Sequence, residues 1–147
     1  MSNAVPLTFR VSATQNTADI TVKCAVSSGS QQTVTVGTEP QAVNLIIDQD
    51  DLEQTVSLTI EMQGKTANHT TVDSEGIIVN DVLINIDNFL LDGIDITNTV
   101  QKLSEYSHNH NGTTSQVHHK FYGTMGCNGT VSMQLTTPVY LWMLEHL

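Results

Sequence analysis

The stretch Val56-Ser57-Leu58-Thr59-Ile60-Glu61-Met62 decides the fold class, because apolar and polar side chains alternate along its whole length. A period of two places the apolar side chains on one face of a β-strand and the polar ones on the other. Similar short apolar or alternating stretches recur at a spacing of roughly ten residues, which is typical of sandwiches and barrels. They are residues 7–12, 18–23, 32–36, 42–47, 77–79, 82–86, 89–91 and 94–96.

Composition and turn signals agree with this interpretation. The chain holds 20 Thr and many Val residues, and both types favour strands over helices. Asp92-Gly93 has the composition of a two-residue hairpin turn. We therefore predict an all-β fold, a jelly-roll-like β-sandwich formed by residues 1–96.

The last 51 residues differ in composition, and we predict that residues 97–147 form an extension used for assembly. Residues 97–106 have the spacing of a short helical turn, and residues 107–119 are polar and His-rich, as in a loop. Residues 129–135 alternate once more and predict a further strand.

The chain ends in its most apolar decapeptide, residues 138–147. Termini fray unless they are tied down, so this tail either docks on its own domain or is buried against a partner. The side chains that we assign to assembly are Tyr140, Leu141, Trp142, Leu144 and Leu147. We expect a homo-oligomer, with a trimer favoured.

The charge of the chain excludes two classes of partner. Its 147 residues carry 15 acidic and 5 basic side chains, a net charge of −10, which is unsuited to binding nucleic acid or an anionic membrane surface. No apolar stretch is long enough to insert into a membrane, and residues 1–6 lack the features of a signal peptide. The two cysteines, Cys24 and Cys127, are expected to be reduced thiols, although one long-range disulfide is an alternative.

The histidines suggest a metal site. His108 and His110 are two residues apart, so in an extended strand their imidazoles would point to the same face. Three chains around a threefold axis would then supply six nitrogens to an octahedral transition metal. His118 and His119 could instead complete a site within one chain, and solvated loop histidines are the plainer alternative.

The acidic residues suggest calcium as a second possible ion. Residues 48–51 are Asp-Gln-Asp-Asp and could supply oxygen ligands, although they lack the spacing of an EF-hand. No nucleophile motif, phosphate loop or distinctive carboxylate pair is present, so we do not expect an enzyme.

The segment from Met62 to Asp95, with its Leu91-Asp92-Gly93-Ile94 edge, resembles calcium-dependent xylan-binding carbohydrate modules. The resemblance covers about residues 7–96 and implies a sandwich that binds sugar through a calcium ion. Asp73 and Asp81 are the positions that match its calcium ligands.

The stretch from Leu91-Asp92-Gly93-Ile94-Asp95-Ile96 to Ser107-His108-Asn109-His110-Asn111-Gly112 resembles tail fibre, spike and baseplate proteins of tailed bacteriophages. In that family His-x-His pairs from three chains enclose a metal ion. The resemblance implies a structural protein of the virion, assembled in the host cytoplasm, with other virion proteins and a host surface glycan as partners. A free carbohydrate-binding module and a capsid decoration protein are the alternatives.

Overall fold

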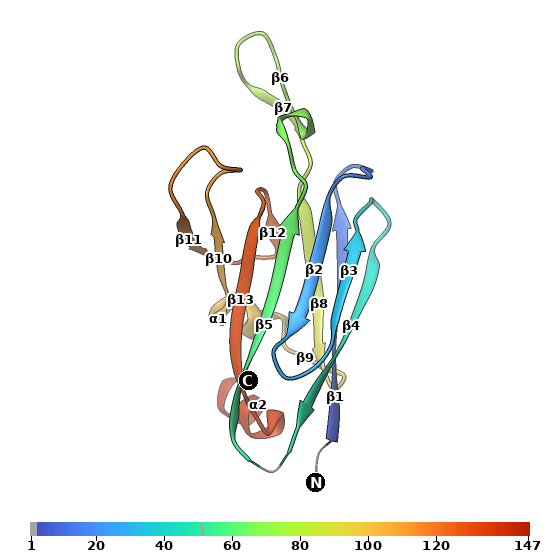
Figure 1. Cartoon of the computed structure of the whole chain (residues 1–147), viewed down its shortest axis with the longest axis vertical. Helices are drawn as coiled ribbons and strands as arrows, with labels where there is room; N and C mark the ends of the chain where they lie inside the picture. The colour runs from blue at the N-terminus through green and yellow to red at the C-terminus, as the bar shows by residue number, and fades with distance from the viewer. Residues whose placement is uncertain (1–2, 51) are drawn as a thin grey trace.

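Two antiparallel β-sheets pack face to face in the computed structural model, which describes residues 3–50 and 52–147 (Figure 1). Sheet A has the order β12-β8-β1-β4, with β9 beside β8, and sheet B has the order β11-β10-β13-β5-β2-β3. The predicted all-β sandwich is confirmed.

The strands of sheet A are β1 (Asn3–Ala13), β4 (Gln41–Gln49), β8 (Ile84–Leu91), β9 (Ile94–Asp95) and β12 (Thr124–Met125). Those of sheet B are β2 (Thr21–Val26), β3 (Gln31–Thr35), β5 (Gln54–Gln63), β10 (Glu105–His108), β11 (Val117–Lys120) and β13 (Gly129–Thr137). The helices are η1 (Ala67–His69), α1 (Thr97–Leu103) and α2 (Val139–His146). None of the helices in residues 3–50 and 52–147 is long and apolar enough to cross a membrane.

The alternation of the sequence produces the core between the sheets. On β5, Val56, Leu58, Ile60 and Met62 point inward and are buried, while the polar residues between them face outward. From sheet A, the ring of Phe9 stacks on that of Phe89 at a centroid distance of 4.8 Å. Burial of each such side chain stabilises the fold by about 1.5–3 kcal/mol, so the period of two is enough to select this architecture.

Residues 97–147 are part of both sheets, which corrects the predicted division at residue 96. Along its whole length β13 pairs with β5, and β12 pairs with β8 of sheet A. The inward residues of β13, which include Val131 and Leu135, are buried in the same core as those of β5. A sandwich of residues 1–96 alone would leave this face of the core open to water.

Two local predictions are confirmed. The predicted helical turn at residues 97–106 is α1, which ends at Leu103 before β10 begins. Asp92 and Gly93 both have positive φ, 50° and 81°, as a tight hairpin turn between β8 and β9 requires.

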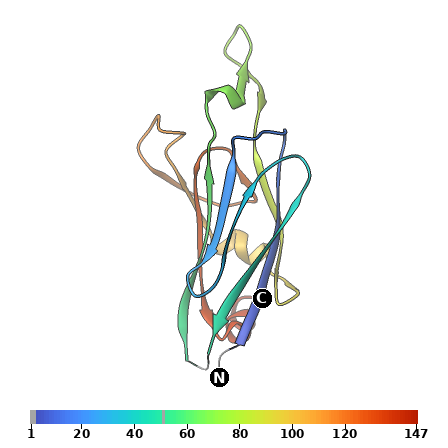
Figure 2. The same ribbon diagram turned by 45° about the vertical axis from the view of Figure 1, so that its right-hand side comes forward.

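A hairpin protrudes from one end of the sandwich (Figures 1 and 2). It comprises β6 (Thr70–Val72) and β7 (Ile78–Asp81), which form a separate two-stranded sheet. We call residues 70–81 the arm. None of its residues is buried, so no core holds it in place.

A buried ion pair fixes the base of the arm. The Lys65 side chain is only 2% exposed, and its Nζ lies 2.6 Å from Oδ1 of Asp81 at the end of β7. Lys65 Nζ also donates to the carbonyl oxygen of Gly126, at 2.5 Å, and Asp81 accepts a hydrogen bond from Thr70. The amide of Asn128 bonds to both the N–H and the C=O of Lys65. Three segments of the chain are thereby joined below the arm.

Replacing Lys65 with Met should lower the free energy of unfolding by about 3 kcal/mol, because the Asp81 carboxylate then loses its buried partner. Urea unfolding monitored by fluorescence measures the change. Lys23→Met, at an exposed position on β2, is the matched control and should be nearly neutral. Equal effects of the two substitutions would contradict a role of the ion pair.

Candidate functional site

The C-terminal decapeptide forms α2, which presents apolar side chains on opposite sides. Val139, Trp142 and Met143 point into the core, and the buried amide oxygen of Gln49 accepts the Val139 N–H at 3.0 Å. Trp142 is only 3% exposed and stacks on His146. The prediction that Trp142 serves assembly is therefore corrected, since this side chain belongs to the core.

The other four predicted assembly residues lie on the outer side of α2. Tyr140 is 46% exposed, Leu141 58%, Leu144 79% and Leu147 60%. Together with Ile94 of β9 they form what we call the α2 surface. Sequence reasoning missed Ile94, because only the packing of α2 beside β9 brings it there. Ile94, Tyr140, Leu144 and Leu147 border a hollow of about 340 Å³.

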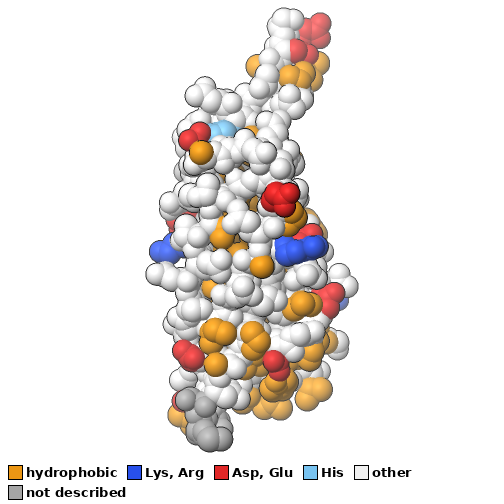
Figure 3. All heavy atoms as spheres, turned by 90° about the vertical axis from the view of Figure 1, so that its right-hand side faces the viewer, with side chains coloured by type: hydrophobic (Ala, Val, Ile, Leu, Met, Phe, Trp, Pro, Cys, Tyr) orange, Lys and Arg blue, Asp and Glu red, His pale blue; other side chains and the backbone are white. Residues whose placement is uncertain are grey.

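The exposed apolar side chains are concentrated at the two ends of the molecule. In Figure 3, they gather at the lower end and again on the arm, where acidic side chains lie beside them. The arm contributes Val72, Ile77, Ile78 and Val79. Contiguous apolar patches of this kind mark interaction sites more often than single exposed residues do.

The histidines form a cluster, but not in the predicted geometry. His108 ends β10, and the chain then turns through His110 and Asn111, whose φ values are 52° and 58°. The rings of His108 and His110 are therefore nearly perpendicular, at a centroid distance of 4.6 Å. His119 of β11 lies 5.3 Å from His108, whereas His118 points away and contacts Glu105 at 3.0 Å.

This cluster favours the neutral form of His108. Burial lowers the pKa of His108, and the nearby imidazoles of His110 and His119 lower it further. Its Nδ1 accepts the backbone N–H of His110 at 3.1 Å, so that nitrogen carries no proton. The proton of the neutral ring is therefore on Nε2.

No metal centre is assembled within residues 3–50 and 52–147 of a single chain. No three His, Cys, Asp or Glu side chains among them are arranged to hold an ion. A site shared by His108 and His110 of three copies stays a prediction.

The two predicted calcium ligands lie at opposite ends of the arm. Asp73 is at the tip, where its carboxylate accepts the N–H groups of Glu75 and Ile77. Asp81 is at the base, paired with Lys65. Asp73 and Asp81 therefore do not form one ligand cluster. In the acidic turn at residues 48–51, Asp51 lies outside the described residues.

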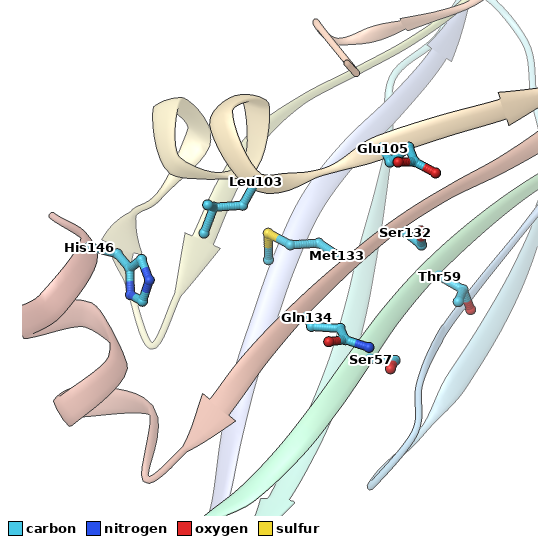
Figure 4. A pocket seen from close by; sticks show the side chains of 8 residues that line it. All are labelled: Ser57, Thr59, Leu103, Glu105, Ser132, Met133, Gln134 and His146. Carbon is cyan, nitrogen blue, oxygen red and sulfur yellow. The ribbon is translucent and has the colours of Figure 1, made fainter. Parts of the chain in front are cut away.

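A polar groove runs along the outer face of sheet B. Its larger part, about 480 Å³, is shown in Figure 4, where Ser57 and Thr59 of β5 stand beside Ser132 and Gln134 of β13. Figure 4 also shows Leu103 and His146 at one end. A second hollow of about 290 Å³ continues past Glu61. We call these hollows together the sheet B groove. Its donors and acceptors suit a neutral ligand rich in hydroxyl groups.

The thiols are free but not activated. Cys24 is fully buried on β2, and burial raises its pKa to about 12. Cys127 is half-buried, and its pKa is also raised, chiefly by burial. Neither therefore carries the thiolate that a nucleophile needs at neutral pH.

No protein-family model, curated protein or solved structure matches the chain. Its function is therefore inferred from its own residues.

The stability of the protein should fall as the pH drops below about 6.5. The pKa of His108 is lower in the folded state than in the unfolded one, so the unfolded state binds more protons in that range. Replacing His108 with Phe should flatten this dependence between about pH 7 and pH 5, measured by urea unfolding at each pH. His118→Phe, on the exposed side of β11, is the control and should keep the slope. An unchanged slope in the His108 variant would rule out this histidine as its source.

Proposed function

We propose that the protein is a non-enzymatic structural component of a bacteriophage virion, of the tail, baseplate or fibre type. It assembles with copies of itself and with other virion proteins, and no catalytic step enters the proposal. The virion assignment is supported by the resemblance of residues 91–112 to tail fibre and baseplate proteins. The role in assembly is supported by the exposed α2 surface.

The α2 surface is the observation on which the proposal depends. A short terminal helix needs one apolar face to dock on its own domain, and Val139, Trp142 and Met143 already supply it. On the opposite face the hydroxyl of Tyr140 donates to Asp92, but Leu141, Leu144 and Leu147 are more than half exposed and stay in water in a lone chain. Covering them with a second protein surface gains about 25 cal/mol for each Å² of apolar area.

Substitution of Leu144 and Leu147 by Glu should convert the oligomer to a monomer. Both side chains are exposed, so the fold tolerates the change, whereas burying two charges in an interface is costly. Size-exclusion chromatography with light scattering measures the mass. Tyr122→Glu, at an exposed aromatic residue outside the α2 surface, is the control and should leave the mass unchanged. A double variant that keeps the mass of the parent oligomer would refute assembly through this surface.

Binding of a surface glycan is a second candidate function, and the sheet B groove favours it. Hydroxyl and amide groups of Thr59, Ser132 and Gln134 line the groove, and Glu105 adds a carboxylate. Such groups form the hydrogen bonds that sugar hydroxyls require. The predicted calcium ligands Asp73 and Asp81 are not among the residues that line the groove.

A xylo-oligosaccharide should therefore bind in the presence of EDTA, and Gln134→Ala should weaken that binding. Isothermal titration measures the affinity, with Thr33→Ala on the outer edge of sheet B as the control. A calcium-dependent module would behave differently. Calcium at 100 times its Kd would raise the free energy of unfolding by about 2.7 kcal/mol, and binding would be lost in EDTA.

A further inference from the structure

We propose that copies of this chain associate head to tail, with the arm of one copy seated in the hollow of the α2 surface of the next. The inference rests on the proposed assembly through the α2 surface and names the segment that covers it. It follows from the shape, composition and position of the two apolar ends of the molecule.

The arm carries four exposed apolar side chains below a tip that holds Asp73 and Glu75. Val72, Ile77, Ile78 and Val79 are each between 53% and 59% exposed. Val72 and Ile78 are register partners and so share one face, whereas Val79 follows on the other face. An isolated two-stranded hairpin is marginally stable, and apolar residues on both of its faces gain nothing in water. Contact with a second surface would stabilise the arm.

The arm is also held in one direction, as a docking element requires. The Lys65–Asp81 ion pair fixes its base. On the other side, the hydroxyl of Thr14 donates to the carbonyl oxygen of Asp81 and accepts the N–H of Leu83. A segment already held in its bound direction loses less conformational entropy when it binds, which increases affinity.

The α2 surface has the complementary shape. The arm is narrow and convex, whereas Ile94, Tyr140, Leu144 and Leu147 surround a hollow of about 340 Å³. A cavity of this size can take several branched aliphatic side chains. Two convex arms would leave most of each other exposed, and two hollows would trap a void, so convex against concave covers the most apolar area.

The positions of the two surfaces decide the partner. The arm and α2 lie at opposite ends of the long axis (Figures 1 and 2), so an arm cannot reach the α2 surface of its own chain. Nine of the exposed large apolar residues among the described ones belong to these two surfaces: Val72, Ile77, Ile78, Val79, Ile94, Tyr140, Leu141, Leu144 and Leu147. A second copy of this chain therefore supplies the missing partner of each surface. The contact joins unlike surfaces, so its repetition generates a ring or a filament.

Two variants that are defective at opposite ends test this contact. The arm variant carries Val72→Thr, Ile78→Thr and Val79→Thr, which keep β-branched residues in the hairpin. The α2 variant carries Leu144→Glu and Leu147→Glu. Loss of the apolar groups of the arm should weaken self-association about a hundredfold, so each variant alone should be a monomer where the parent is an oligomer.

An equimolar mixture of the two variants should then form a one-to-one heterodimer and nothing larger. The intact arm of the α2 variant meets the intact α2 surface of the arm variant, and no free pair of ends remains to continue the chain. Native mass spectrometry distinguishes the heterodimer from either monomer. Ile46→Thr, the same kind of change at an exposed position on β4, is the control and should preserve the oligomer.

Each other outcome overturns a different statement. An arm variant that assembles like the parent would overturn the arm contact and leave assembly through the α2 surface standing. Two monomeric variants that do not combine would overturn the head-to-tail arrangement in favour of contacts between like surfaces. A parent protein that is itself monomeric would overturn the proposed function and this inference with it.

Discussion

The pairing of β13 with β5 is the constraint on which the rest of the molecule depends. It joins residues 54–62 to residues 129–137 and places β13 in the middle of sheet B. The chain runs directly from β13 into α2, so the same ladder determines where the α2 surface lies. The loop before β13 carries Gly126 and Asn128, which bind Lys65 at the base of the arm. One long-range pairing therefore positions both apolar ends.

The buried ion pair of Lys65 and Asp81 contributes more to the direction of the arm than to the stability of the fold. Removing two charges from water costs several kcal/mol for each ion, and apolar residues of similar size often stabilise a fold as well or better. A charged pair with fixed hydrogen bonds has one good arrangement, whereas an apolar pair has several. Because this pair lies at the base of an otherwise unsupported hairpin, its single arrangement holds the arm in one direction.

The sequence predicts what depends on neighbours along the chain and fails where distant segments meet. The strands follow from alternation, and the Asp92-Gly93 turn from its composition. The His108–His110 geometry fails because an i, i+2 rule holds only while the strand continues, and here it ends at His108. The sequence does not distinguish the buried Trp142 from its exposed neighbours. The tail is apolar along most of its length, so it has no periodic pattern that shows which side of the helix faces the core. The sheet B groove depends on the register between β5, β10 and β13, which no local pattern encodes.

The charge of the chain acquires a spatial meaning once the fold is known. Of the 15 acidic residues, 13 precede residue 97. Along the sequence this distribution suggests an acidic body followed by a nearly uncharged extension. Strands from both parts of the chain lie side by side in each sheet, so the folded protein has no separate acidic body and uncharged extension. What remains is an elongated molecule with a net charge of −10, whose exposed apolar side chains are concentrated at its two ends. The ends carry acids as well, Asp73 and Glu75 on the arm and Glu145 on α2, but contact between them removes the most exposed apolar surface from water. The distribution of apolar surface, rather than that of charge, thus favours association along the long axis.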